Sequence, residues 1–412
     1  MNDRIYGGSG NDIIDGEASN DTVDYSLDPA GVTINLLAGT ATDGWGNTDT
    51  LRNFEHATAS AFADTITGSA GSNVITAGAG NDTVTSGDGN DTLSGGAGDD
   101  TLSAENGSDT LSGGAGNDTL DGGAGTDTAD YSADVAAVTV NMAAGTATDG
   151  WGGTDSLANF ENLTGSAYAD TITGSTGSNQ INAGAGNDTV YGGDGNDTLT
   201  GGTGDDLLYG EAGSDTFISG SGADTYDGSS STDTLSFVND IAGVTASLAS
   251  GAATDGWGAT DTITGIENLT GSAYADTLTG NSTANTLTGG GGNDSLSGGG
   301  SGDALYGGAG ADTFLFLPGE NGIDTVADFA LTAGGVTGDI LDISDLLTGY
   351  TAGVSDITLF ARISDDAGNS KVEVDRDGSA STYAFSQVAT LQSITGLTDE
   401  AALVTSGQLL AA

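Results

Sequence analysis

Large apolar residues recur every nine positions along much of the chain, and turn-forming residues separate them. Leu102, Leu111 and Leu120 stand nine apart, and each has small or polar neighbours on both sides. The unit reads G-G-x-G-x-D-x-U-x, where U is the large apolar residue. Glycine permits the positive φ angles of a tight turn, and successive side chains of a strand point to opposite faces. The pattern therefore predicts short strands with U facing inward, joined by tight turns.

Two nine-residue units would make one coil of a parallel solenoid, so the predicted fold class is all-β. Each turn would aim backbone carbonyl oxygens and one aspartate carboxylate at the turns of adjacent coils. Hard oxygen ligands in a flexible cage suit Ca²⁺ better than Mg²⁺, and many calcium ions are the expected cofactor. The predicted metal ligands share this aspartate position: Asp12, Asp82, Asp91, Asp100, Asp109, Asp118, Asp127, Asp188, Asp197, Asp206, Asp215, Asp224, Asp294, Asp303 and Asp312. Asn73, Asn179 and Asn285 occupy the same position, and turns that carry them should bind calcium less well.

A second repeat of 106 residues divides the chain into modules. Trp45, Trp151 and Trp257 each lie in Asp-Gly-Trp-Gly, and 34-residue spacers at 25–58, 131–164 and 237–270 precede the nine-residue units. Strand-like alternation in the spacers favours about two wider coils that continue the solenoid without calcium. The predicted divisions are an N-terminal coil (1–24), module 1 with eight units (25–130), module 2 (131–236), a shorter module 3 (237–315) and a β-rich C-terminal cap (316–412).

The charge balance restricts the possible partners. The chain has 59 acidic and 5 basic residues, a formal net charge of −54, and no Lys or Arg between Arg52 and Arg362. Neutralising cations for that stretch must therefore come from solution. The same charge would repel nucleic acid and an anionic membrane surface.

The nine-residue units resemble the RTX calcium-binding repeat, a parallel β-roll in known members of that family. Residues 316–412 resemble the C-terminal target domain of RTX proteins secreted by type I systems. The resemblance implies a solenoid cap with an uncleaved export signal and an extracellular location. No N-terminal signal sequence and no transmembrane segment are expected.

Catalysis finds little support in the sequence. Cysteine is absent, and the single histidine, His56, stands where the other modules carry Asn162 and Asn268. No nucleophile elbow, zinc-protease motif or phosphate loop is present, so we expect a protein that is not an enzyme.

The favoured function is a secreted structural protein that assembles with itself in calcium, as a surface-layer or filament subunit. One alternative is an adhesin or a module that binds polysaccharide or ice, using the tryptophans or rows of threonine. Its partner would be a cell-surface polysaccharide. The other alternative is the secretion portion of an RTX hydrolase.

Overall fold

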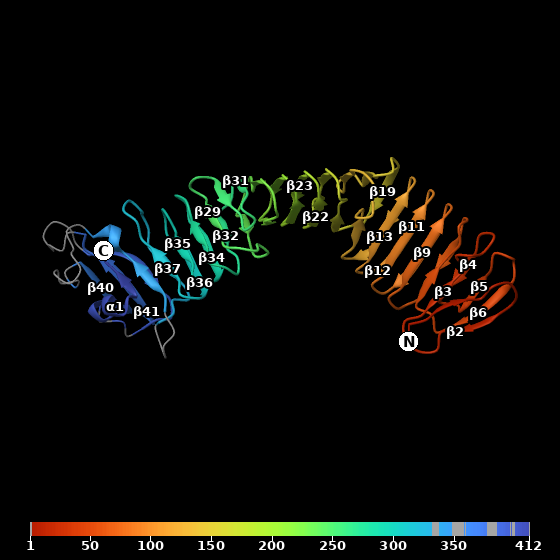
Figure 1. Cartoon of the computed structure of the whole chain (residues 1–412), viewed down its shortest axis with the longest axis horizontal. Helices are drawn as coiled ribbons and strands as arrows, with labels where there is room; N and C mark the ends of the chain where they lie inside the picture. Colours follow the sequence, from red (N-terminus) through yellow and green to blue (C-terminus); the bar gives the residue numbers. More distant parts are fainter. Residues whose placement is uncertain are drawn as a thin grey trace. The chain divides into compact units, whose positions relative to one another are not determined.

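The computed structural model describes residues 2–331, 338–347, 358, 360–376, 385–395, 397 and 400–411. The chain divides into two compact units, Met1–Thr203 and Gly204–Ala412, and each is described by itself. In both units short strands stack side by side as successive coils (Figure 1). In the described residues the fold is all-β apart from one short helix and a few residues in 3₁₀ conformation, which confirms the predicted class.

The first unit has two sheets, and one of them is wholly parallel. In spatial order this sheet contains β1 (Arg4–Tyr6), β3 (Thr22–Asp24), β7 (His56–Thr58), β9 (Val74–Ala79), β11 (Thr92–Ala97), β13 (Thr110–Ala115), β16 (Thr128–Asp130), β20 (Asn162–Thr164), β22 (Gln180–Ala185) and β24 (Thr198–Thr203).

The second sheet of this unit mixes parallel and antiparallel pairs. Its strands are β2 (Ile13–Asp15), β6 (Thr48–Arg52), β5 (Thr40–Thr42), β4 (Thr33–Asn35), β8 (Thr65–Thr67), β10 (Thr83–Asp88), β12 (Thr101–Gly107), β14 (Thr119–Asp121), β15 (Ala124–Gly125), β19 (Thr154–Ala158), β18 (Thr146–Thr148), β17 (Thr139–Asn141), β21 (Thr171–Thr173) and β23 (Thr189–Asp194). Strands β4 to β6 form an antiparallel meander, as do β17 to β19, and the remaining pairs are parallel.

The second unit repeats this plan. One sheet contains β26 (Thr216–Ile218), β28 (Thr234–Ser236), β32 (Asn268–Thr270), β34 (Thr286–Gly291), β36 (Ala304–Ala309), β38 (Asp324–Val326), β42 (Ser386–Leu391), β41 (Asn369–Val374) and β40 (Ala361–Asp366). The other contains β25 (Leu207–Ala212), β27 (Thr225–Asp227), β31 (Thr260–Thr264), β30 (Ala252–Thr254), β29 (Thr245–Ser247), β33 (Thr277–Thr279), β35 (Ser295–Ser297), β37 (Thr313–Leu315), β39 (Ile340–Asp342) and β43 (Leu409–Leu410).

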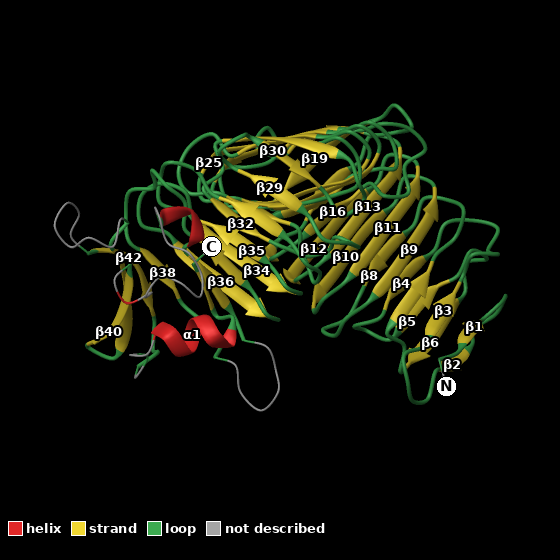
Figure 2. Cartoon of the chain, turned by 60° about the vertical axis from the view of Figure 1, so that its left-hand side comes forward, coloured by secondary structure: helices red, strands yellow, loops and turns green. Residues whose placement is uncertain are grey.

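The spacers differ from the prediction of two wider parallel coils. Each one inserts an antiparallel three-stranded meander into one sheet: β4 to β6, β17 to β19 and β29 to β31. Strands β4, β5 and β6 of the first meander are labelled in Figure 2. The other sheet receives a single parallel strand from each spacer: β7, β20 or β32. Tight turns of a few residues between these strands favour antiparallel pairing, since parallel neighbours need a long crossover.

The nine-residue units form the core as predicted. Leu93 and Leu111 from one sheet and Leu102 and Leu120 from the other are at most 1% exposed. Consecutive strands of a sheet are 18 residues apart, so Leu102 pairs in register with Leu120. Each coil therefore consists of two units.

Turn glycines are required by the close stacking of coils. Gly96 has a φ of +110°, and a side chain there would collide with the carbonyl group of Gly78 in the preceding coil. Only glycine combines that backbone conformation with so close an approach.

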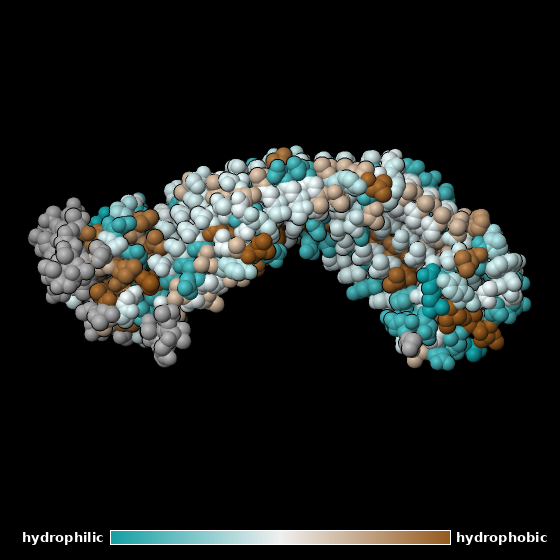
Figure 3. Space-filling model, viewed as in Figure 1, coloured by the Kyte–Doolittle hydropathy of each residue, from teal (hydrophilic) through white to brown (hydrophobic). Residues whose placement is uncertain are grey.

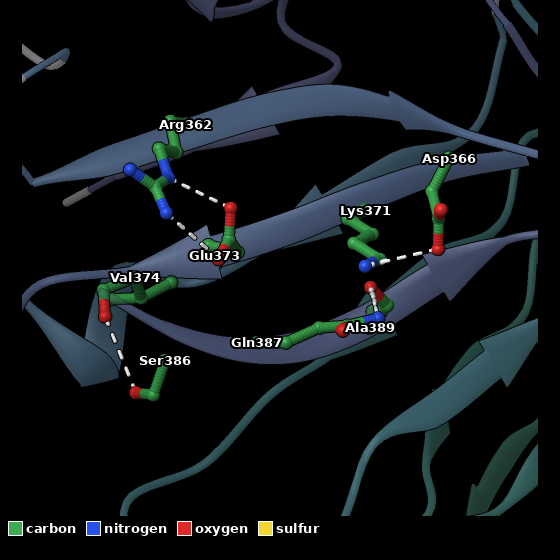
Figure 4. A network of polar contacts seen from close by, with 8 residues as sticks. All are labelled: Arg362, Asp366, Lys371, Glu373, Val374, Ser386, Gln387 and Ala389. Carbon is green, nitrogen blue, oxygen red and sulfur yellow. Dashed lines mark hydrogen bonds and ion pairs between the residues drawn. The ribbon is translucent and has the colours of Figure 1, made fainter.

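The cap has its own antiparallel hairpins. Arg362 on β40 donates two hydrogen bonds to Glu373 on β41, of 2.7 and 3.0 Å, and Lys371 lies 3.0 Å from Asp366 (Figure 4). The helix α1 (Glu400–Ser406) contacts β43 and β40, and the 3₁₀ turn spans Ser344–Leu346. Part of the predicted cap, including 348–357 and 377–384, lies outside the described residues.

The face drawn in Figure 3 is mostly hydrophilic or neutral, with hydrophobic side chains in small separate patches. Among the described residues, no helix has the length and apolar character needed to cross a membrane.

Candidate metal centre

The predicted aspartates form a ladder through one carboxylate oxygen each. The backbone N–H of Asp82 donates to Asp100 Oδ1 over 2.8 Å, and that of Asp100 donates to Asp118 Oδ1 over 2.8 Å. On the other edge, Asp91 donates in the same way to Asp109, over 2.7 Å. Each carboxylate thus links its own turn to the turn 18 residues earlier.

The second oxygen of most of these carboxylates is buried without a hydrogen-bond partner. This holds for Oδ2 of Asp12, Asp82, Asp91, Asp100, Asp109, Asp118, Asp127, Asp294, Asp303 and Asp312. The residues from Asp82 to Asp312 in this set are at most 3% exposed, and Asp12 is half-buried. A buried ionised carboxylate is costly unless it is paired or bound to a metal, so a bound cation would stabilise the ionised form of these groups.

Carbonyl oxygens of the neighbouring coil lie beside the unpartnered carboxylate oxygens. A side-chain carbon placed on Gly95 would lie 2.7 Å from the Gly113 carbonyl oxygen and would collide with Asp100 Oδ2. Gly289 has the same surroundings, formed by Asp294 Oδ2 and the Gly307 carbonyl oxygen. Mixed carboxylate and carbonyl oxygens at the junction of two coils are the ligands that Ca²⁺ prefers.

Burial raises the pKa of several carboxyl groups in the coils, Asp82, Asp100 and Asp294 among them. The pKa of Asp100 rises to about 7, first through burial and then through the charges of Asp82 and Asp118. Burial likewise raises the pKa of Asp294 to about 7 and that of Asp82 to about 6. A bound divalent cation would remove both causes, because it replaces the lost solvation and neutralises the neighbouring charges.

The described residues contain no group of three or more His, Cys, Asp or Glu side chains arranged around one metal position. The turns instead offer one carboxylate each, together with backbone carbonyls. They therefore fit calcium, with its many oxygen ligands, and do not fit a structural zinc site of His and Cys.

The remaining predicted ligands occupy the same positions. Asp188, Asp197, Asp206 and Asp215 are at most 2% exposed. Asp224 differs, because Tyr226 donates its hydroxyl hydrogen to Asp224 Oδ2 over 2.9 Å. A calcium ion at that turn would have to displace this hydrogen bond.

The first two turns of each block satisfy their own polar groups. Asp64 accepts hydrogen bonds from the backbone of Val32 (2.6 Å) and from the backbone (2.7 Å) and hydroxyl (2.8 Å) of Ser60. Asn73 accepts from the Ser69 backbone over 2.7 Å and donates to the Glu55 carbonyl over 2.6 Å. Asn179 and Asn285 make the equivalent bonds. In these turns, donors and acceptors of the protein itself therefore satisfy the side chain at the acidic position.

The ladder also contains aspartates that the sequence prediction omitted. They include Asp64, Asp170, Asp233, Asp276, Asp324 and Asp339. The first four keep the nine-residue phase, which could have identified them. Asp324 and Asp339 follow longer insertions, and only their position at the first residue of a strand (Asp324) or directly before one (Asp339) indicates their role.

His56 has a structural contact. Its Nδ1 accepts a hydrogen bond from the backbone of Val74 over 2.9 Å, and Asn268 Oδ1 accepts the same kind of bond from Thr286, also over 2.9 Å. The half-buried His56 therefore links β7 to β9. Trp45, Trp151 and Trp257 are 49%, 40% and 39% exposed, so each indole is half in solvent.

The stacked coils and their buried carboxylates define a calcium-binding parallel β-solenoid. The chain belongs to the RTX family: the model described as "RTX calcium-binding nonapeptide repeat (4 copies)" matches residues 1–28, 58–93, 94–129, 164–199, 191–226, 200–235, 261–296 and 279–314, more than half of the chain. RTX repeat proteins are typically secreted by type I systems, which supports an extracellular location.

One solved structure with similarity is the extracellular lipase LipA from Serratia marcescens, with 17% identity and a TM-score of 0.19. The match covers 85% of this chain and 40% of the lipase chain. No curated protein matches the sequence.

Proposed function

We propose that this protein is a secreted, calcium-dependent structural protein that assembles with itself outside the cell, and that it is not an enzyme. Nearly all described residues before 316 belong to coils or to the meanders between them. His56, the single histidine of the sequence, accepts a hydrogen bond from the backbone N–H of Val74. This repetitive architecture supports a structural role.

The outer edge of the first coil is the observation that carries the proposal. Among the described residues, β1 pairs with β3 and β2 pairs with β6, each on one side only. Tyr6 and Ile13 on these strands are 51% and 70% exposed. An unpaired strand edge is a template for another chain, and a head-to-tail contact of this kind builds open polymers.

Asp12 would provide a calcium ligand at such a contact. Its Oδ2 has no hydrogen-bond partner, as in the turns inside the solenoid. A calcium ion bound there would take its remaining oxygen ligands from a turn of the next copy. Calcium would then join copies in the way it joins coils.

The test compares Asp12→Asn with Asp100→Asn by light scattering after calcium addition. Asp12→Asn should fold normally and assemble at least several-fold more slowly, whereas Asp100→Asn should lower stability and leave the contact surface intact. Removal of residues 1–24 should impair assembly further. If both Asp12→Asn and the truncated chain assemble as fast as the unchanged protein, the edge contact is refuted.

Export through the C-terminal region is the second part of the proposal. Its support is the typical type I secretion of RTX proteins. Deletion of residues 317–412 should retain the protein in the cell, and normal secretion of that truncation would refute the export role.

A binding role has one supporting observation. Every module exposes a tryptophan, and Phe62, Tyr168 and Tyr274 are 46%, 46% and 49% exposed at the same 106-residue interval. Half-exposed aromatic rings suit stacking on sugars. Loss of polysaccharide binding in Trp257→Ala, without loss of assembly, would favour the adhesin alternative. The intact mass of the native protein tests the remaining alternative, the secretion portion of a hydrolase.

A further inference from the structure

Each spacer carries a second kind of acidic turn, Asp-Gly-Trp-Gly-x-Thr-Asp. Its last aspartate continues the ladder described above, because the backbone N–H of Asp224 donates to Asp261 Oδ1 over 3.0 Å. Asp12 donates to Asp49 over 2.9 Å and Asp118 donates to Asp155 over 3.0 Å in the same way. The tryptophan turn of each spacer is therefore stacked directly on a calcium turn.

In the first spacer, side chains of the protein satisfy both aspartates of this turn. The Asn47 amide donates to Asp43 Oδ2 over 3.0 Å, and the Tyr25 hydroxyl donates to Asp49 Oδ2 over 2.9 Å. These two donors leave no carboxylate oxygen of the pair without a partner in the described structure.

In the third spacer, both donors are missing from the sequence. Ala259 stands at the position of Asn47, and Phe237 stands at the position of Tyr25. Oδ2 of Asp255 and Oδ2 of Asp261 consequently have no hydrogen-bond partner. The two residues are 3% and 1% exposed, so bulk solvent does not reach these oxygens.

The second spacer is intermediate. Gly153 replaces the asparagine, and Asp149 Oδ2 has no partner, but the Tyr131 hydroxyl still donates to Asp155 Oδ2 over 3.1 Å. The number of carboxylate oxygens in this turn that accept a hydrogen bond therefore falls from the first spacer to the third, because the donor side chains are lost one after the other.

Other groups around the third spacer add to the demand for a cation. Asp240 is 4% exposed and lies beside Ser219, yet neither Asp240 Oδ1 nor the Ser219 hydroxyl has a hydrogen bond of ordinary geometry. No Lys or Arg occurs between Arg52 and Arg362 to balance these charges.

We infer that Asp255 and Asp261 of the third spacer bind an additional calcium ion, and that the first spacer lacks this site because Asn47 and Tyr25 occupy its place. Asp255 lies outside the segments that match the repeat family. Since no three carboxylates surround one position, backbone carbonyls, the Ser219 hydroxyl and water would complete the six to eight oxygen ligands of calcium. The inference does not depend on self-assembly.

The test gives the third spacer the donors of the first. The double variant Phe237→Tyr/Ala259→Asn should bind one calcium ion fewer per chain than the unchanged protein, counted by native mass spectrometry at saturating calcium. Both side chains are accommodated at the equivalent positions of the first spacer, so circular dichroism in calcium should be unchanged. An unaltered calcium count in the folded double variant would overturn the inference.

The reciprocal exchange and a neutral control complete the design. Tyr25→Phe/Asn47→Ala should gain one calcium ion in the first spacer, and this result decides the question if the first double variant fails to fold. Ala259→Gly, which introduces the residue of the second spacer, should keep the calcium count of the unchanged protein. A loss of calcium in this control, or no gain in the reciprocal variant, would contradict the proposed site.

Discussion

Each block of nine-residue units contains two kinds of turn with the same backbone arrangement. In the first two turns of a block, the side chain at the acidic position has different hydrogen-bond partners from those in the turns that follow. Asp64 and Asn73 are surrounded by donors from the protein itself. Asp82 and Asp100 have one oxygen in the ladder and one with no partner. The same coil geometry can therefore be closed by hydrogen bonds or left open for an ion, and nearby serine or asparagine side chains decide which.

This comparison predicts that removal of calcium unfolds most of the solenoid. Unpartnered buried carboxylates repel one another without the ion, and binding energy is folding energy where no site exists in the unfolded chain. Circular dichroism at pH 7.5 in EGTA should show a largely disordered chain, and added calcium should restore the β signal. A solenoid that keeps its β signal in EGTA would show that the open turns do not require the ion.

Acidification should partly replace calcium. The pKa of Asp100 and Asp294 is about 7 in the fold, against an ordinary value of 3.8. A carboxyl group whose pKa is raised by folding binds more protons in the folded state than in the unfolded state. Its contribution to the free energy of unfolding is therefore greatest below pH 4 and declines as the pH rises toward 7. In EGTA, the β signal should be larger at pH 4.5 than at pH 7.5. An equal or smaller signal at the lower pH would contradict the burial of these groups.

Removal of one unpartnered carboxylate should have a moderate effect. Asp100→Asn keeps the ladder hydrogen bond but loses a ligand, and loss of one site should cost about 2.7 kcal/mol when calcium is a hundredfold above its Kd. Urea unfolding in calcium measures the change. The exposed neighbour Asp99 supplies the control, since Asp99→Asn should change stability by only about 0.5 kcal/mol. Equal effects of the two variants would remove the distinction between ligand and surface carboxylates.

The smallest effect on stability is expected for a substitution in a turn that the protein satisfies with its own hydrogen bonds. Asn73→Asp loses the hydrogen bond to the Glu55 carbonyl, and a buried hydrogen bond contributes about 1 kcal/mol to stability. The variant should unfold at lower urea in calcium than the unchanged protein. A gain in stability with one more bound ion would mean that the carboxylate alone, rather than its surroundings, creates a calcium turn.

The sequence predicted the regular part of this arrangement well. Fixed nine-residue spacing locates the buried Leu102 and the ladder position of Asp100, because a stacked coil repeats every contact at the same interval. The spacing could not show that Asp64 and Asp82 have different hydrogen-bond partners, since Val32 donates to Asp64 from 32 residues away in a spacer. The hydrogen bond from Tyr25 to Asp49 joins residues 24 positions apart that lie outside the nine-residue units, so the nine-residue period could not predict it.

The antiparallel meanders also affect the order in which the chain can fold. Strands β4 and β5 pair residues as close as Asn35 and Thr40, whereas parallel neighbours in the coils lie 18 residues apart. Contacts between residues close in sequence cost less loop entropy and form faster. We therefore expect the three meanders to form before the parallel coils, so that coils would be added from three defined starting points in place of many equivalent ones.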